Sequence, residues 1–319
     1  MLDGSGLIGG HRTGRLPLRP WDLSSSLVGY RADKRNLFKL NVIKLRRVAS
    51  VINGAVDPGV SMASDQNFLL EMIEAAGIKS LQPSLAVREL KQGETIADTG
   101  EVVKWVYFPH SGVLSCVVGL ANGAAVAGGL IGKDGAFGAV QALDSMVSLN
   151  KVFVMVPGKA SVIEASRLVK AVEALPMLRR ILLTYEQFFL AQVQQTAACN
   201  ALHDIPRRTC RWLLRMEELV GVSFPLTQEA LALMMGVRRP TVTQIAGKMQ
   251  DEGLISYGRG RMELIDVRGM RKVSCDCHQE LESHHQLVFE QLGRDVNPSR
   301  APRAPNAQKR SSGDSELGH

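Results

Sequence analysis

The segment Leu226–Ser256 constrains the fold of this chain most, because its residues predict two short helices joined by a tight turn. Thr227 can cap the first helix, and Gly236 supplies the left-handed residue that ends it. The second helix carries an apolar stripe with the spacing that packs on a core: Val242, Ile245, Ala246 and Met249. The pattern predicts a helix-turn-helix.

The other side of the second helix is polar and basic. Arg238 and Arg239 stand at its start, and Thr243, Gln244 and Lys248 follow. A short helix with basic and amide side chains at its N-terminal end suits the major groove of DNA. The alternative is an ordinary helical hairpin whose basic face is only solvated.

Residues 256–265 favour the DNA-binding interpretation. They predict a strand, a tight turn at Gly258-Arg259-Gly260 and a second strand. Such a hairpin after a helix-turn-helix is a wing, and it places Arg259 and Arg261 where they can contact phosphates. A winged helix-turn-helix is a more specific signal than either of its halves.

The residues before the winged segment predict an all-β domain. A short helix over Phe68–Gly77 precedes several strand-like runs, which turns rich in Gly, Asn and Pro separate. The expected strands are Leu85–Leu90, Val102–Phe108, Val113–Leu120, Ala124–Ile131, Lys151–Pro157 and Lys159–Ile163. Short strands with this punctuation are typical of a barrel or jelly roll.

Two more helices are expected between this domain and the wing. The first runs from Pro176 to about His203, and its stripe predicts a contact with a second copy of the chain; packing only on its own barrel is the alternative. That stripe contains Leu178, Ile181, Leu182, Tyr185, Phe189, Gln192, Val193 and Thr196. The second helix, Pro206–Val220, is expected to expose a solvated face of arginines: Arg207, Arg208, Arg211 and Arg215.

Both ends of the chain are expected to be disordered. Residues 1–61 are rich in Gly, Ser and Arg and lack sustained periodicity, and Met62 looks like a natural protein start. Residues 276–319 are expected to form a tail that is mostly disordered, with some helical character before Asn297.

Charge and hydropathy narrow the classes of function. The net charge is +7, and residues 204–274 hold twelve Lys and Arg against eight Asp and Glu, which suits a DNA-binding segment. Five scattered cysteines and no secretory segment fit a reduced, cytoplasmic location. The uncharged run Gly112–Gly132 is long enough to span a bilayer, but Asn122-Gly123 at its middle predicts a hairpin of two buried strands.

Catalytic chemistry is not evident in the sequence. It has no paired carboxylates, no Ser/His/Asp arrangement and no nucleophile elbow, so no enzymatic activity and no cofactor are predicted. Cys275-Asp276-Cys277-His278, with His284 and His285 nearby, lacks the paired Cys-x2–4-Cys spacing of structural zinc sites, and an incidental cluster is preferred to a metal site. A metal-dependent enzyme that uses these residues is the alternative, which metal analysis would decide.

The order of a β-roll, a long helix and a winged helix resembles the Crp/Fnr family of bacterial transcription regulators, over roughly residues 65–275. The most specific segments are HDIPRRTCRWLL (203–214), residues 226–255, GRGRMELID (258–266), VYFPHSGV (106–113) and GKDGAFG (132–138). The resemblance implies an α+β fold. Its parts are a cyclic-nucleotide-binding-like double-stranded β-helix, or jelly roll, at 62–175, a dimerisation helix at 176–203 and a winged helix-turn-helix domain at 204–275.

The resemblance also assigns roles to single residues. The family's base-reading arginine falls on Arg239, whose guanidinium can bind O6 and N7 of guanine, and its second base-reading position falls on Gln244. Gln228, Arg238 and Thr241 match positions that hold phosphates. Pro240 replaces the Glu of the family's cyclic-AMP-binding regulator, so a different half-site is expected.

The sensor half departs from the family members that bind cyclic nucleotides. Their pocket uses a Gly-Glu pair and an Arg-Ser or Arg-Thr pair, whereas Phe137–Val156 contains no Glu and no Arg. Without a guanidinium the charge-assisted contact to the phosphate is lost, so cyclic AMP is not the expected ligand. The N-terminal cysteine cluster of the Fnr branch is absent, and nothing specifies a haem ligand.

These inferences predict a homodimeric, sequence-specific DNA-binding transcription regulator, open to control by an unidentified effector at the β-roll. Its expected partners are double-stranded DNA, a second copy of the chain and RNA polymerase, with no membrane. DNA contacts are expected from Gln228, Arg238, Arg239, Thr241, Thr243, Gln244, Lys248, Arg259 and Arg261. The alternative is a small-molecule or redox sensor that acts through protein partners, which need not show the steep salt dependence of phosphate neutralisation.

Overall fold

The computed structural model describes residues 66–143 and 147–296, and it describes no side chains for residues 294–296. The disorder predicted for residues 1–61 and for residues 297–319 therefore falls outside the described ranges. Within those ranges, no helix is long and apolar enough to cross a membrane.

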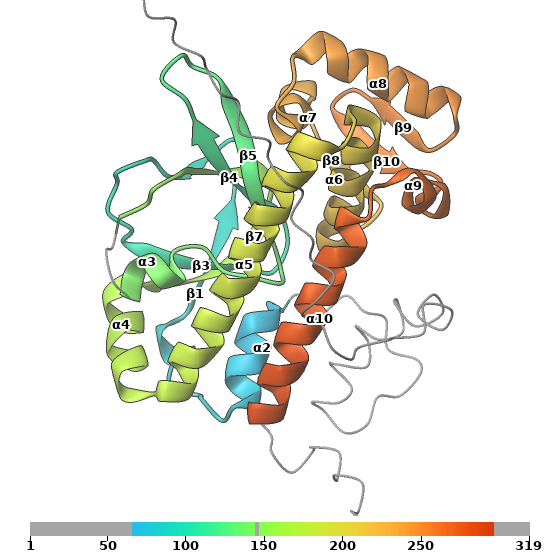
Figure 1. Ribbon diagram of the computed structural model, residues 1–319. Helices are drawn as coiled ribbons and strands as arrows, with labels where there is room; N and C mark the ends of the chain where they lie inside the picture. The colour runs from blue at the N-terminus through green and yellow to red at the C-terminus, as the bar shows by residue number, and fades with distance from the viewer. Residues whose placement is uncertain (1–65, 144–146, 297–319) are drawn as a thin grey trace, which may run out of the picture. The chain divides into compact units, whose positions relative to one another are not determined.

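Two antiparallel sheets form a β-roll in the first half of the described chain (Figure 1). One has the strand order β1-β7-β3 and the other the order β2-β6-β4-β5. The strands are β1 (Ala86–Leu90), β2 (Thr95–Ala97), β3 (Trp105–Pro109), β4 (Val113–Gly119), β5 (Ala125–Ile131), β6 (Lys151–Val156) and β7 (Gly158–Glu164). The predicted jelly roll is confirmed, whereas the three-residue strand β2 was too short to be expected from sequence.

The uncharged run Gly112–Gly132 forms the hairpin β4–β5. Leu114 pairs with Ile131 and Gly119 with Ala125, and Gly123 takes a φ of 82° in the turn, which glycine adopts without strain. Five successive residues of β4 are buried, so both faces of the strand are covered. The prediction of two buried strands in place of a membrane helix is confirmed.

Alternate residues of β3 serve two different cores. Tyr107 faces the interior between the two sheets, where apolar residues of both sheets pack together. Val106 and Phe108 pack outward against helices, among them α2 (Phe68–Ala75), α4 (Ala165–Ala174) and α5 (Pro176–Leu202). This period of two follows from the pleat of a strand that is covered on both sides. The short helices η2 (Gln82–Ser84) and α3 (Ala139–Leu143) complete the roll.

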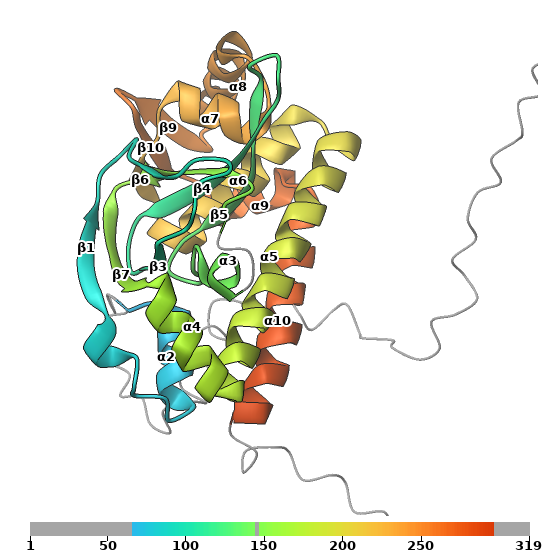
Figure 2. The ribbon, with the colours of Figure 1, turned by 90° about the vertical axis from the view of Figure 1, so that its left-hand side faces the viewer.

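A helix occupies part of the segment predicted to be a mostly disordered tail. Residues 277–296 form α10 (Cys277–Val296), which lies alongside α5 (Figure 2). Leu281, Phe289 and Leu292 are buried, and the ring of Phe289 lies 5.1 Å from that of Phe68. The prediction was wrong for this stretch, because three well-spaced apolar residues are a weak periodic signal and tertiary packing supplies most of a helix's stability.

The stripe of α5 that was predicted to face a second copy packs mainly within the chain. Six of its eight residues are buried there: Leu178, Ile181, Leu182, Tyr185, Gln192 and Thr196. Gln192 Oε1, for example, accepts a hydrogen bond of 2.9 Å from the backbone N–H of Leu130. The contact predicted for that stripe was therefore wrong. The strongest apolar stripe of a long helix is taken by its own core, and a different face of α5 is exposed.

The arginines of α6 (Ile205–Val220) are mostly buried, so the predicted solvated face was wrong. Arg208 and Arg211 are 8% and 2% exposed, and Arg207 is the exposed one of the four. Arg208 donates to Asn200 Oδ1 at 3.1 Å and to the Met235 carbonyl at 3.2 Å. The reason is topological: α6 contacts α7, α9, α10 and β8.

The C-terminal half contains the expected winged helix-turn-helix. Helices α7 (Gln228–Met235) and α8 (Arg239–Asp251) are followed by a small sheet of order β8-β10-β9. Its strands are β8 (Ser223–Pro225), β9 (Ile255–Gly258) and β10 (Arg261–Leu264), and α9 (Val267–Val273) comes after them. The α+β fold class is thereby confirmed.

Candidate nucleic-acid interface

Local backbone chemistry sets the turn between α7 and α8. Thr227 Oγ1 accepts a 3.0 Å hydrogen bond from the backbone N–H of Ala230, which caps the start of α7. Gly236 ends the helix with φ 62° and ψ 36°, a left-handed conformation that a residue with a Cβ adopts at a cost. These two residues fix the direction in which α8 leaves α7.

Helix α8 separates a core face from an exposed face. Val242, Ala246 and Met249 are buried, as their spacing predicts. On the other side Thr243, Gln244 and Lys248 are exposed, and so are Arg238 and Arg239 at the start of the helix. Pro240 lies in the first turn, where its missing N–H costs no helical hydrogen bond. The helix therefore presents an exposed polar surface that takes no part in the packing of the core.

Contacts with α7 orient the guanidinium of Arg239. Its Nε donates to Gln228 Oε1 at 2.8 Å, and its Nη1 lies 3.0 Å from Glu229 Oε1. The side chains of Arg239 and Glu229 are 65% and 66% exposed. An ion pair that exposed is worth little, so the guanidinium can exchange Glu229 for another acceptor at small cost.

The wing ends in a tight turn made by Arg259 and Gly260. Both have positive φ, 51° and 74°, as a two-residue hairpin turn requires. The turn leaves Arg259 exposed. Arg261 follows on β10, where its Nε donates to Ser223 Oγ at 3.0 Å. Both wing arginines thus stand on a short, well-defined hairpin.

A polar pocket of about 350 Å³ lies between the start of α7, the start of α8 and the wing. Its lining residues are Thr227, Gln228, Glu229, Arg239, Tyr257, Gly258, Arg259 and Gly260. Three predicted site residues therefore meet there: Gln228, Arg239 and Arg259. The others lie outside the lining; Thr241 is half-buried, and Arg238, Thr243, Gln244, Lys248 and Arg261 are exposed.

Two residues of this region escaped the sequence analysis. Glu229 pairs with Arg239, and the Tyr257 hydroxyl donates to the Leu226 carbonyl at 3.1 Å, which ties the wing to the start of α7. An acidic residue in the first turn of a helix is ordinarily explained by the helix dipole. For this reason the sequence alone did not indicate the ion pair of Glu229 with Arg239. Tyr257 resembled any strand residue.

An apolar cluster lies in the interior of the roll, near the stretch from which the cyclic-nucleotide contacts are missing. Phe137, Val152 and Val154, all from the stretch that lacks Glu and Arg, pack there with Leu114 and Ile131. These five side chains carry no charge, whereas the guanidinium of Arg88 on β1 lies 5.5 Å from the centre of the Tyr107 ring and pairs with Glu94. That cyclic AMP is not the ligand stays a prediction.

The cysteines fall into two groups. Burial raises the pKa of Cys116 and of Cys210 to about 12, so these two thiols stay protonated and unreactive. The other three lie together with His203, where a hydrogen bond with Cys199 lowers the pKa of Cys275 below its ordinary value. A second group of possible metal ligands is Glu218, His278 and Glu282.

Comparisons with known proteins identify the winged segment. Residues 207–273 match the family model described as a Crp-like helix-turn-helix domain. The transcriptional regulator SdrP of Thermus thermophilus is 34% identical over 61 residues, which is 19% of this chain and 30% of that protein. The HTH-type transcriptional regulator Cmr of Mycobacterium tuberculosis is 21% identical over 249 residues, 72% of this chain and 97% of that protein.

The fold is also found among solved structures. FixK2 from Bradyrhizobium japonicum matches with a TM-score of 0.52 at 16% identity, over 60% of this chain and 98% of that chain. At that identity the likeness concerns the fold, and it extends beyond the winged segment to the long helix and the β-roll.

Proposed function

We infer that the chain is a transcription regulator of the Crp/Fnr type, with a Crp-like helix-turn-helix domain at residues 207–273. We propose that it binds specific DNA as a homodimer. The observation that carries the proposal is Arg239. Its guanidinium is exposed at the start of α8, beside the wing, and is held by the amide of Gln228. In this position a guanidinium can reach the edge of a guanine in the major groove.

Base and phosphate contacts divide between different residues in this proposal. Arg239 and Gln244 contact bases, and Thr243 and Lys248 extend the same exposed face of α8. The phosphate contacts come from Gln228, Arg238, Thr241 and the wing residues Arg259 and Arg261. Phosphate contacts carry affinity and orientation, while base contacts carry specificity.

The exposed face of α5 supports the homodimer. Leu183 and Leu190 are 44% and 56% exposed, and Ala197 continues the same line at a spacing of seven residues. Gln187, Gln194 and Ala201, also exposed, lie beside them. A seven-residue repeat keeps one seam of a helix turned toward a partner helix. Two copies joined along α5 would place two α8 helices about 34 Å apart, on one face of a near-palindromic site.

The test is to select bound sequences from a random DNA pool with the full chain, and then to measure affinity for the selected site. The Arg239→Ala variant should lose about 1–3 kcal/mol on that site and tolerate substitutions at one base pair. Arg167→Ala is the matched control, since Arg167 is an exposed arginine of α4 that pairs with Glu164; its affinity should equal that of the wild type. Equal losses for Arg239→Ala on specific and random duplexes would contradict the base-reading role.

Salt dependence tests the phosphate contacts. The logarithm of the affinity should fall steeply and linearly with the logarithm of salt concentration, because bound phosphates release counterions. A shallow dependence would instead favour a sensor that acts through protein partners.

Repeating the selection with added cell metabolites tests the control of DNA binding by an effector at the roll. A cytoplasmic location and a contact with RNA polymerase belong to the same proposal.

A further inference from the structure

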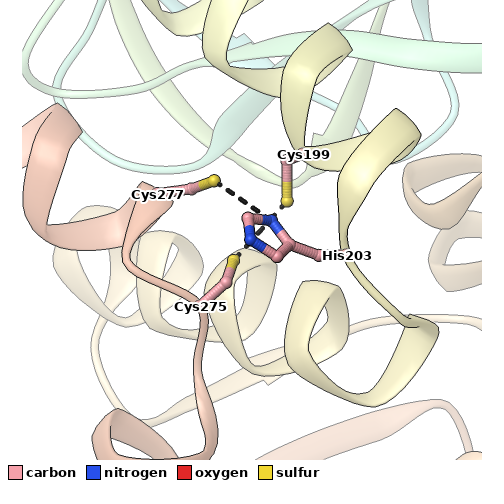
Figure 3. Close-up of side chains that lie close together, drawn as sticks. All are labelled: Cys199, His203, Cys275 and Cys277. Carbon is pink, nitrogen blue, oxygen red and sulfur yellow. Dashed lines mark hydrogen bonds between the residues drawn. The ribbon is translucent and has the colours of Figure 1, made fainter. Parts of the chain in front are cut away.

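The end of α5 and the start of α10 bring together four residues that are typical metal ligands. They are Cys199, His203, Cys275 and Cys277, here named the Cys3His cluster (Figure 3). Cys199 and His203 are four residues apart, one helical turn, at the C-terminal end of α5. Cys275 and Cys277 stand on either side of Asp276, where α10 begins. All four ligand atoms lie within 4.8 Å of one another.

The distances suit one tetrahedral ion. Cys199 Sγ lies 3.6 Å from Cys275 Sγ, and Cys277 Sγ lies 3.5 Å from His203 Nδ1. Zinc bonds of about 2.3 Å to sulfur and about 2.0 Å to nitrogen place tetrahedral ligand atoms about 3.5–3.8 Å apart. A disulfide would need a sulfur separation of about 2.05 Å, so these thiols are not bonded to each other.

Burial gives the cluster the character of a structural site. Cys199, Cys275 and Cys277 are 0%, 5% and 3% exposed, and they form a small core of their own. His203 is half-buried. With Cys275 it lines a pocket of about 400 Å³ together with Arg207, Lys272 and others. The pocket gives an ion or a chelator a route to the cluster.

A buried arginine supplies the charge that a metal-loaded cluster would need. Arg211 of α6 is 2% exposed and interacts electrostatically with the three cysteines of the cluster. Its Nη2 donates to Thr196, whereas its Nε and Nη1 have no hydrogen-bond partner, and no carboxylate of residues 66–143 and 147–296 pairs with it. A buried charge needs a compensating one. Three thiolates and one divalent ion carry a net charge of −1, which Arg211 would offset.

We propose that the Cys3His cluster binds one zinc ion, which joins the end of the long helix α5 to the start of α10. Zinc takes four tetrahedral sulfur and nitrogen ligands in closed structural sites, and a Cys3His set is among the common ones. All four ligands lie outside residues 207–273, the range of the helix-turn-helix match. The ion thus holds two segments that flank the DNA-binding domain, and the inference does not depend on the proposed function.

The other group of possible ligands does not compete for the same role. His278 lies 3.6 Å from Glu218 and 3.7 Å from Glu282, but its Nε2 also lies 3.1 Å from Arg271 Nη1. Arg271 contacts Glu217 and Glu282 as well. A guanidinium at this distance occupies the position of a cation, so these residues form an ion-pair network.

The test uses the full chain purified under reducing conditions without chelator. Elemental analysis should find one zinc per chain, and replacement of that zinc by Co²⁺ should produce the visible absorption of tetrahedral cobalt together with thiolate-to-cobalt charge transfer. Adding a strong chelator should lower the midpoint of thermal unfolding, because an ion that binds only the folded state stabilises it.

Matched variants distinguish the effect of losing a ligand of the Cys3His cluster from the effect of losing any buried cysteine. Cys277→Ser should lose the zinc and the response to chelator, whereas Cys116→Ser, at a buried cysteine of β4, and Glu282→Gln, in the ion-pair network, should retain both. If Cys277→Ser does not fold, the wild-type cobalt spectrum decides the question. A reduced wild-type protein that holds no zinc and shows no tetrahedral cobalt spectrum would overturn the proposal. So would a Cys199–Cys275 disulfide in anaerobically purified protein, or one iron per chain in place of zinc.

Discussion

Replacing Arg215 by methionine removes a buried positive charge while keeping a side chain of similar length. Arg215 Nη2 lies 2.5 Å from Asp134 Oδ2 in the roll, and its Nη1 lies 3.1 Å from Glu218 Oε2. The side chains of Arg215 and Asp134 are only 13% and 17% exposed. The pair therefore joins α6 to the β-roll in surroundings that water screens poorly.

The expected loss follows from what the variant leaves behind. Burial alone would raise the pKa of Asp134, but the charge and hydrogen bond of Arg215 overcome it and hold that pKa below its ordinary value. Breaking a buried pair by removing one partner costs about 3–5 kcal/mol, since the other charge stays unpaired. Because some solvent reaches the pair, we expect Arg215→Met to lower the free energy of unfolding by about 3 kcal/mol at neutral pH.

The assay is urea unfolding at one protein concentration for all variants, because the stability of the proposed dimer would depend on that concentration. Arg207→Met is the control on the same helix: Arg207 and Asp204 are 58% and 62% exposed and 3.8 Å apart, so the loss should be under about 1 kcal/mol. The double variant Arg215→Met/Asp134→Asn should be more stable than the sum of the single losses predicts, since it leaves neither charge of the Arg215–Asp134 pair without its partner.

The pH dependence has a definite sign. A lowered folded-state pKa means that the contribution of Asp134 is present above its ordinary value of 3.8 and is lost as the pH falls through the lower folded value. In Arg215→Met, burial acts on Asp134 without Arg215, so its carboxyl takes up a proton at a higher pH than in the wild type. The difference in the free energy of unfolding between the wild type and Arg215→Met, here called the deficit, should then shrink as the pH falls from neutral toward acid. A deficit below about 1 kcal/mol, or one that pH does not change, would refute the reasoning.

Three more outcomes can be measured. Glu229→Gln removes the carboxylate that competes for Arg239, so affinity for the selected DNA should rise about twofold, as suits an exposed pair, and an unchanged or lower affinity would count against that competition. Leu190→Asp should shift the chain toward monomer in analytical ultracentrifugation, whereas Leu287→Asp, at an exposed leucine of α10, should not; a dimer that survives Leu190→Asp contradicts the proposed seam. Burial raises the pKa of Glu186 from 4.5 to about 7, so stability should decline as the pH rises between those values, and Glu186→Gln should flatten this decline.

The elements that could be predicted from sequence are those whose signal is local. The caps Thr227 and Gly236, the stripe of α8 and the turn at Asn122-Gly123 each act through neighbours a few residues away. For this reason the helix-turn-helix, the wing and the hairpin β4–β5 match their predicted ranges closely. The exposure of most candidate DNA-contacting residues followed from the same periodicity.

Which elements pack against each other could not be predicted in that way. The stripe of α5 indicates only that something covers it, and the structure shows that α10 and the roll are part of that cover. The buried arginines of α6 illustrate the same limit: Arg208 and Arg211 resemble a solvated face until the elements around α6 are in place.

What the sequence determined by itself was the kind of chain: short strands, a long helix and a winged helix-turn-helix with an exposed basic face, all encoded by periodicity and turn residues. Tertiary structure alone decided which charges are buried and which distant residues meet. Cys199 and Cys275 are 76 positions apart, so no local sequence spacing could predict the cluster that they share. Helical and strand periods act over a few residues, whereas ligand sets and buried ion pairs depend on the packing of whole elements.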